Sequence, residues 1–267
     1  MGDFVHLHVH TEYSLLDGLS KIKDAIKRVK SCGMDALAIT DHGSMCGVVD
    51  FYLACLKEEI KPIIGVETYV ARRAHNLKEG RQDAEPYHLL LLAKDYTGYK
   101  NLMKMISIAH IEGYYYRPRV DKALLRQFHE GIIATSACLA NDIARAHIAG
   151  NYEEAKRIAL EYQDIFGEGN FFLEIQRHHY RNYLKEHTVG DEIYQDLSET
   201  QVKEDAVYEG NIKLSRETGI PLVCTNDCHY VTQDDAEAQD CLICIGTGKQ
   251  MAETTKRLRM VDARAYY

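Results

Sequence analysis

Short apolar runs alternate with longer amphipathic stretches along the whole chain, and this alternation restricts the possible folds more than any other feature. The short runs are rich in β-branched residues, as in buried strands, and the longer stretches repeat apolar residues with the 3.6-residue period of a helix. Parallel strands joined by crossover helices produce this pattern. We predict strands at 4–9, 36–40, 63–70, 88–93, 131–136, 171–176 and 222–226, and helices at 20–31, 45–58, 99–109, 152–166 and 202–218.

The number of strand–helix units predicts an α/β fold, a barrel of the TIM type with one unit missing or irregular. An open doubly wound sheet would more often carry a glycine-rich phosphate loop after its first strand, and none is present there. Segment 73–86 is charged and aperiodic, so we expect it to be a mobile surface loop. No repeat or linker divides the chain. We therefore place one domain at 1–250 and expect 251–267 to begin a connection to a downstream region.

The composition favours a cytoplasmic protein that makes no contact with a membrane. The N-terminus is polar and rich in histidine, unlike a signal peptide, and no apolar run approaches the roughly 20 residues of a membrane helix. The eight cysteines are then reduced thiols or metal ligands rather than a disulfide framework. The net charge of -8 limits any DNA contact to a local surface, because a nucleic-acid footprint is normally basic.

Three histidines alternate in the first predicted strand, in VHLHVH, so that His6, His8 and His10 project from one face. Buried imidazoles need partners, which metal ligation supplies; the alternative is a set of hydrogen-bonded core or surface histidines. Asp17 in SLLDG could fold over the same site or form an ordinary turn before Gly18. Further candidate ligands stand at the ends of other strands, which converge on one mouth in a barrel: His42, Glu67, His88, Cys138, Asp227 and His229.

Four blocks, VHLHVHTEYSLLDGL, ALAITDHGSMCGVVDFY, PIIGVETYVA and TNDCHY, resemble the PHP (polymerase and histidinol phosphatase) domain of the bacterial DNA polymerase III alpha subunit. The resemblance implies a distorted (β/α)7 barrel whose C-terminal mouth holds up to three divalent metal ions, zinc or manganese. Asp17, Asp227 and His229 are expected to be catalytic as well, whereas Asp41 and His6 are expected to orient ligands. The metal ligands that the resemblance implies are His8, His10, Asp17, His42, Glu67, His88, Cys138, Asp227 and His229.

The activity that the resemblance implies is metal-dependent phosphodiester hydrolysis, a 3′-5′ exonuclease that proofreads within a DNA-directed DNA polymerase. Water activated by one ion would attack phosphorus in line while another ion stabilises the leaving oxygen. The expected partners are a DNA 3′ end, the remainder of the polymerase alpha subunit, a proofreading exonuclease subunit and other replisome proteins. Two alternatives stay open: a catalytically silent scaffold domain that binds a partner, and a phosphatase for a small phosphomonoester, similar to histidinol phosphatase.

The segment YYYRPR combines aromatic and guanidinium groups, a composition that stacks on and steers a nucleic-acid strand. A packed loop beside the barrel wall is the alternative interpretation. Arg177 follows the sixth predicted strand and could touch a phosphate there. The candidate nucleic-acid contacts are therefore Tyr115, Tyr116, Arg117, Arg119 and Arg177.

Overall fold

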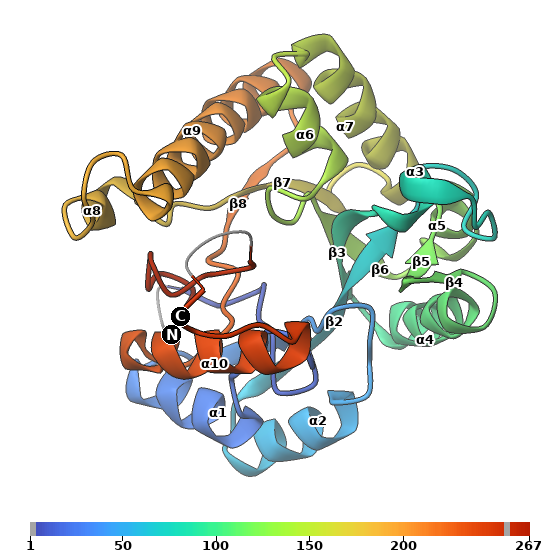
Figure 1. Ribbon diagram of the computed structural model, residues 1–267. Helices are drawn as coiled ribbons and strands as arrows, with labels where there is room; N and C mark the ends of the chain where they lie inside the picture. The colour runs from blue at the N-terminus through green and yellow to red at the C-terminus, as the bar shows by residue number, and fades with distance from the viewer. Residues whose placement is uncertain (1–3, 254–256) are drawn as a thin grey trace.

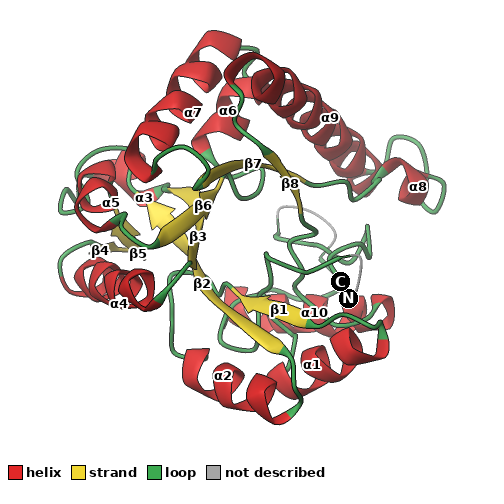
Figure 2. Ribbon diagram, turned by 180° about the vertical axis from the view of Figure 1, so that it is seen from behind, coloured by secondary structure: helices red, strands yellow, loops and turns green. Residues whose placement is uncertain are grey.

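The protein, described here by a computed structural model of residues 4–253 and 257–267, folds as a strongly curved sheet ringed by helices (Figures 1 and 2). The predicted α/β, barrel-like fold is confirmed. Along the sheet the order is β4-β5-β2-β3-β6-β7-β8, and β1 pairs with the first half of β2. The strands are β1 (Ala36–Ile39), β2 (Lys61–Val70), β3 (Tyr87–Ala93), β4 (Tyr114–Tyr115), β5 (Arg117–Val120), β6 (Ile132–Thr135), β7 (Phe171–Ile175) and β8 (Leu222–Cys224).

The expectation that all strands are parallel is wrong at β3. This strand runs antiparallel to both of its neighbours, β2 and β6, whereas β1, β6, β7 and β8 make parallel pairs in the order of the chain. A continuous apolar strand such as YHLLLLA is buried on both faces in either direction, so its hydrophobicity does not reveal its orientation. The reversal places the first residues of β3, rather than its last, at the same end of the barrel as the last residues of β2.

The first predicted strand, 4–9, is not a regular strand, but it occupies the position of one. The His6 and Val9 carbonyls accept hydrogen bonds from Ala38 and Thr40 on the β1 side. On its other side the His8 carbonyl accepts from the Cys228 amide, and the His10 amide donates back to Cys228. The segment therefore closes the curved sheet between β1 and the chain that follows β8. Its side chains are held by these two neighbours although its own backbone is irregular.

All five predicted helices are present, and short ones were missed. Helix α9 begins ten residues before the predicted start, while α7 has the predicted bounds. Two of the missed helices, α5 and α6, have seven residues each, too few to display a 3.6-residue period, although Asp121 and Asn141 cap their first turns. No described helix is both long and apolar enough to cross a membrane. The α-helices are α1 (Ile22–Ser31), α2 (Val48–Lys57), α3 (Gly80–Ala84), α4 (Tyr96–Ile111), α5 (Lys122–Phe128), α6 (Asp142–Ile148), α7 (Tyr152–Phe166), α8 (Arg181–Leu184), α9 (Glu192–Thr218) and α10 (Ala236–Thr247).

Strand β3 shows how the barrel is filled on both faces. Leu89 and Leu91 pack outward with Leu102 of α4 in the largest hydrophobic cluster, and Leu90 packs with Ala38 of β1 in a smaller one. All four of these leucine and alanine positions on the strands are fully buried. Burying a leucine stabilises the fold by about 1.5–3 kcal/mol, so this strand is a rigid support for the residues at its ends.

Candidate metal centre

The structure brings all nine predicted ligands together at one end of the barrel. His42 follows β1, Glu67 lies in β2, and His88 lies near the start of the antiparallel strand β3. Cys138 follows β6. His8 and His10 come from the irregular first segment, Asp17 from the loop after it, and Asp227 and His229 from the chain after β8.

Glu67 lies at the centre of this cluster. Its Oε1 is 3.0 Å from His88 Nδ1 and 3.3 Å from His8 Nε2, and its Oε2 is 2.7 Å from His42 Nδ1. Cys138 Sγ lies 3.7 Å from Glu67 Oε1 and 3.6 Å from His88 Nδ1. The carboxylate is almost inaccessible to solvent, with 1% of its surface exposed. One side chain thus contacts ligands delivered by four separate segments.

Asp227 and Asp17 complete the cluster on the side of the N-terminal segment. Asp227 Oδ1 is 3.1 Å from His8 Nε2 and 3.2 Å from His10 Nε2. Asp17 Oδ2 is 3.6 Å from His42 Nε2 and 4.0 Å from His229 Nε2. Asp227 adopts a left-handed backbone conformation with a φ of 52°, which aspartate tolerates better than most residues.

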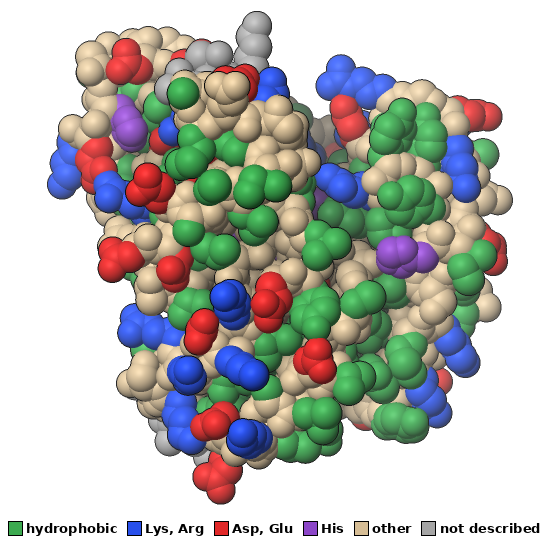
Figure 3. Space-filling view, turned by 60° about the horizontal axis from the view of Figure 1, so that its bottom comes forward, with side chains coloured by type: hydrophobic (Ala, Val, Ile, Leu, Met, Phe, Trp, Pro, Cys, Tyr) green, Lys and Arg blue, Asp and Glu red, His purple; other side chains and the backbone are tan. Residues whose placement is uncertain are grey.

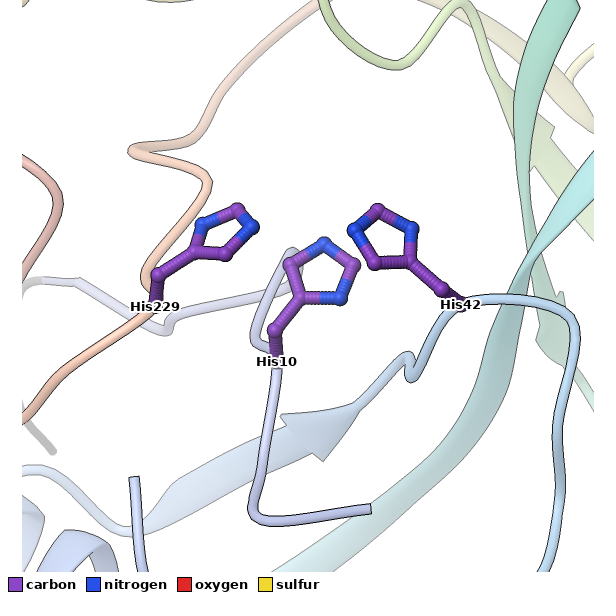
Figure 4. A group of neighbouring side chains, drawn as sticks. All are labelled: His10, His42 and His229. Atoms are coloured by element: carbon purple, nitrogen blue, oxygen red, sulfur yellow. The ribbon is translucent and has the colours of Figure 1, made fainter. Parts of the chain in front are cut away.

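Hydrogen bonds on the outer nitrogens fix which nitrogen of each imidazole faces the cluster. His8 Nδ1 is 2.7 Å from Glu174 Oε1, and His229 Nδ1 is 2.8 Å from the Asp227 carbonyl, so in both rings Nδ1 donates and Nε2 keeps its lone pair. His10 Nδ1 is 3.1 Å from Ser14 Oγ, whose own hydrogen is donated to Asp41. The three Nε2 lone pairs therefore point toward the cluster, as metal ligation requires. Figure 4 shows the rings of His10, His42 and His229 facing one another.

The inner atoms of the cluster are buried and lack hydrogen-bond partners. Seven of the eleven such side-chain atoms in the described part of the chain belong to the nine residues. Polar atoms that are buried without a partner are rare, and a bound cation satisfies all of them at once. Three overlapping groups have ligand atoms within 4.8 Å of one another: His10, His42 and His229; His8, His10 and Asp227; and His42, Glu67 and His88. Five imidazoles, three carboxylates and one thiol suit zinc or manganese better than calcium or magnesium.

The protonation of the cluster is also compatible with metal ligation. Burial, with repulsion from His42 and His229, lowers the pKa of His10 to about 3, so this ring is neutral at physiological pH. Burial opposes ionisation of Asp17, but the His42 ring 3.6 Å away, with the more distant His229 and His10 rings, outweighs burial and lowers the pKa of Asp17 to about 2. His8 and His42, in contrast, have raised pKa values because neighbouring carboxylates outweigh their burial, so without metal these two rings hold a proton on the inner side that a bound cation would replace. Excess negative charge thus surrounds the rings and would attract cations.

Cys138 requires a cation to act as the predicted thiolate ligand. Burial raises the pKa of its thiol well above the ordinary value, and the carboxylates of Glu67 and Asp227 raise it further. A nearby divalent ion reverses this effect and deprotonates a coordinating thiol. The preceding residue, Ala137, has a φ of 49°, a strained conformation for alanine that turns the chain just before the sulfur.

Arg119 lies elsewhere than the YYYRPR prediction places it. Its guanidinium is completely buried and donates hydrogen bonds to four carbonyls, those of Gly113, Asp83, His75 and Leu77. The arginine therefore fastens the segment 73–86 to the barrel, and it is not accessible to a nucleic-acid strand in this conformation. Segment 73–86 is therefore not the mobile surface loop that we expected, because these hydrogen bonds hold it against the barrel and because it contains the short helix α3.

Other candidates in YYYRPR face outward beside the cluster. Arg117 is exposed, and its guanidinium carbon lies 5.8 Å from the ring centre of Tyr69, which is 5.2 Å from the ring centre of His88. Tyr116 is 68% exposed, and its ring lies against that of the half-buried Tyr115. These three residues therefore stay candidates for contact with a nucleic-acid strand.

Two further predictions have different outcomes. Arg177 is half-buried, with its guanidinium paired to Asp205 at 2.8 Å and stacked on the Tyr208 ring at 4.5 Å, so its charge is already balanced. His6 does not orient a ligand: its Nδ1 contacts Cys228 Sγ at 3.3 Å on the outer side of the segment. Asp41, in contrast, does support His10 through Ser14.

Glu174 contacts the candidate cluster through His8, and the sequence did not lead us to expect it there. It is buried in β7, where it accepts hydrogen bonds from His8 Nδ1, from the hydroxyls of Thr135 and Thr225, and from the Gln176 amide. The available signal was one ionisable residue inside the apolar run FFLEI. A charged side chain in a buried strand needs several partners, and such residues cluster at functional sites.

Comparisons with known proteins agree with this geometry. The sequence matches the PHP domain family over residues 6–178. It is 45% identical to the DNA polymerase III subunit alpha of Borreliella burgdorferi, over 98% of this chain and 21% of that protein, and 44% identical to that of Treponema pallidum, over 95% and 20%. The chain thus spans about a fifth of the length of these relatives. An amidohydrolase from Chromobacterium violaceum, solved with sulfate and no metal, has a similar fold with a TM-score of 0.50 at 15% identity, covering 85% of this chain and 87% of that one.

Proposed function

The chain belongs to the PHP domain family, and from this premise we propose that it hydrolyses phosphodiester bonds at a DNA 3′ end, as the 3′-5′ exonuclease domain of a bacterial DNA polymerase III alpha subunit. The observation that carries the proposal is the set of seven buried, unpartnered atoms that converge in the cluster. Structural metal sites are usually closed by four ligands per ion, whereas nine ligands for up to three ions leave positions for water and substrate.

The residues of this chain have distinct tasks in the proposed reaction. Up to three zinc or manganese ions, held by the nine residues, would supply an activated water and stabilise the leaving oxygen. Glu174 holds His8 in the tautomer that presents Nε2 inward. Asp17, Asp227 and His229 hold the part of the cluster nearest the N-terminal segment, and we assign them to the reacting phosphate as well as to the metals.

In this proposal the DNA strand approaches the cluster over the hairpin of β4 and β5. The exposed Arg117 lies over Tyr69, whose ring adjoins that of His88, so we assign Arg117 to a phosphate contact and Tyr115 and Tyr116 to stacking. The surface in Figure 3 mixes Lys and Arg with Asp and Glu, in agreement with a local rather than a general DNA contact. The proposal places the protein in the cytoplasm, where eight free cysteines stay reduced.

A scaffold role has one observation in its favour. Helix α2 exposes an apolar face, with Val49, Leu53 and Leu56 at 59%, 60% and 52% exposure. Such a face suits contact with the remainder of the polymerase or with a proofreading subunit. The scaffold role predicts no hydrolysis, whereas the enzyme role predicts hydrolysis that depends on the cluster, so a variant of one cluster residue distinguishes the two roles.

The test combines elemental analysis with cleavage of a labelled, mismatched primer-template in manganese. The wild type should hold about two or three ions and remove the mismatched 3′ nucleotide, whereas Asp227→Asn should lose about 100-fold or more of the rate with an unchanged circular dichroism spectrum. Asp164→Asn, which changes an exposed carboxylate, is the matched control. Bound metal without cleavage would support the scaffold, and hydrolysis of phosphomonoesters alone would support a small-molecule phosphatase.

A further inference from the structure

A cavity of about 410 Å³ adjoins the metal cluster and is not explained by metal binding. Two candidate ligands, Cys138 and Asp227, and the supporting residue Glu174 form its inner end. The rest of its wall comes from the loop after β6, from the end of β7 and the segment that follows it, from α6 and α9, and from the segment 258–266. The volume lies within the range of cavities that bind small organic ligands. A group bound in this cavity would therefore lie next to any phosphate held at the cluster.

The walls of the cavity are largely aromatic and apolar. Tyr180, Tyr208 and Tyr266 contribute rings, and Val207 and Met260 contribute aliphatic and thioether surface. Surface of this kind binds a flat ring by stacking and by burial of apolar area.

The tyrosine rings are fixed before any ligand binds. The Tyr266 ring stacks on His178 at 4.3 Å, and the Tyr180 and Tyr266 hydroxyls are hydrogen-bonded to each other. The Tyr266 carbonyl accepts hydrogen bonds from the His229 and Tyr230 amides at 2.7 and 3.2 Å, so the C-terminal segment is anchored directly to a candidate ligand. Little conformational entropy remains to be lost when a ligand enters.

Two cations also line the cavity, and one is not neutralised. Arg145, near the end of α6, is exposed and has no ion-pair partner among the residues that the structure describes. Lys203 of α9 is 3.6 Å from Glu199, an exposed pair of the kind that contributes little. An anionic group attached to a flat ring is the ligand that satisfies both the rings and the free cation.

We propose that this cavity binds the nucleoside of a nucleoside monophosphate unit, with its phosphate at the Cys138 and Asp227 edge of the cluster. The inference rests on the proposed function, in that the phosphate is the one hydrolysed, and it adds where the terminal nucleoside lies. The ring stacks among the tyrosines and Met260, and Arg145 faces the negative charge. Stacking on aromatic side chains strengthens the binding of a base by roughly 5- to 150-fold and tolerates any base, as a nuclease without sequence preference requires.

The test is isothermal calorimetry on the full chain with zinc bound, using deoxyadenosine 5′-monophosphate and inorganic phosphate as separate probes. The nucleotide should bind at least about tenfold more tightly than phosphate, which corresponds to the lower part of the stacking range. Val207→Trp fills the cavity from α9 and should remove most of that advantage while phosphate affinity is unchanged. Val202→Trp, on the same helix but 65% exposed and outside the cavity, is the matched control and should change neither affinity.

Equal affinity of the wild type for the nucleotide and for phosphate would overturn the inference, whether or not the tryptophan variant folds. So would a Val207→Trp protein that keeps the nucleotide advantage. The proposed function fails differently, through absence of hydrolysis while Val207-dependent nucleotide binding persists. A short single-stranded oligonucleotide as a third probe distinguishes the sources of the nucleoside. If both the mononucleotide and the oligonucleotide bind in a Val207-dependent way, the ligand is the end of a DNA strand. If only the mononucleotide does, the ligand is a free nucleotide.

Discussion

At the scale of single residues, the cluster depends on side chains that are not ligands. Glu174 fixes His8, Ser14 fixes His10 with the help of Asp41, and a main-chain carbonyl fixes His229. Each bond selects the tautomer whose inner nitrogen can bind a metal. The arrangement is preorganised because all these partners are buried.

Glu174→Gln should weaken metal binding without removing a ligand. The amide has one donor group and one acceptor, so it cannot accept all four hydrogen bonds that the carboxylate accepts, and it removes the negative charge opposite His8 Nδ1. The contact with His8 therefore loses strength. We expect an affinity for zinc about 10- to 100-fold lower, measured by competition with a chromophoric chelator. Glu168→Gln, which changes an exposed carboxylate, controls for the charge. Unchanged affinity would show that the His8 contact has no functional role.

At the scale of elements, the hairpin of β4 and β5 divides its residues between two tasks. Pro118 packs so closely on the loop after β1 that a Cβ on Gly43 would lie 2.8 Å from its Cγ. Arg119 faces inward and ties down 73–86, while Arg117 faces outward over Tyr69. The turn between the two strands places Tyr116 at a φ of 58°, a left-handed conformation that residues other than glycine rarely adopt.

Arg119→Met should destabilise the protein by about 3–5 kcal/mol, because it leaves four buried or partly buried carbonyls without their charged donor. Arg117→Met should change the free energy of unfolding by less than about 0.5 kcal/mol, because its side chain is exposed. Urea denaturation followed by circular dichroism measures both values. Similar losses for the two variants would contradict the division of tasks.

The packing of α6 against α9 adds a pH-dependent contribution to stability. His147 of α6 is buried, and its Nε2 is 3.2 Å from Asn211 Oδ1 of α9. Burial lowers the pKa of His147 in the folded protein below the 6.5 of the unfolded chain. Between the folded and the unfolded pKa, the unfolded chain binds a proton that the folded protein does not. The contribution of His147 to stability is therefore complete above pH 6.5 and is lost as the pH falls from 6.5 through the lower pKa of the folded protein.

His147→Gln, which keeps a donor toward Asn211, should flatten the decline of the free energy of unfolding between pH 7.5 and 5.5. The comparison is made on metal-free protein by urea titration at several pH values, and the difference between the two proteins isolates this residue from the histidines of the cluster. His187→Gln, on a histidine outside the hydrophobic clusters, is the control. Parallel pH profiles would show that His147 does not titrate on unfolding.

At the scale of the whole molecule, the cluster joins segments that are far apart in the sequence. Ligands between His8 and His229 meet where the N-terminal segment closes the sheet against the chain after β8. Metal ions bound at this junction would therefore stabilise the closure of the barrel as well as the site.

Removal of metal with EDTA should lower the melting temperature of the wild type by roughly 5–10 °C for each tightly bound ion present at 100 times its dissociation constant. The reason is that the seven inner atoms lose their partners while they stay buried. Differential scanning calorimetry with calcium-saturated EDTA as the control measures the shift. An unchanged melting temperature, with metal loss verified by elemental analysis, would mean that no ion occupies the junction.

Much of the fold and the membership of the cluster were predictable from local patterns. Strand and helix periods located the main elements, and ionisable residues at strand ends, such as Glu67 and Cys138, marked one face of a barrel. Asp41, which we expected to orient a ligand, accepts hydrogen bonds from Thr11 and from Ser14 beside His10. The metals and the nuclease activity stay predictions, as do the residue roles that depend on them.

What the sequence by itself determined is therefore which segments are buried and which polar residues interrupt them, because burial and periodicity are local properties. Only the tertiary structure decided the direction of β3, the irregular backbone of 4–9, the inward position of Arg119 and the role of Glu174. Each depends on a neighbour that is distant in the chain: a sheet edge, a loop carbonyl or an imidazole. Hydrogen bonds across such distances leave no period in the sequence, so they are settled only when the whole barrel closes.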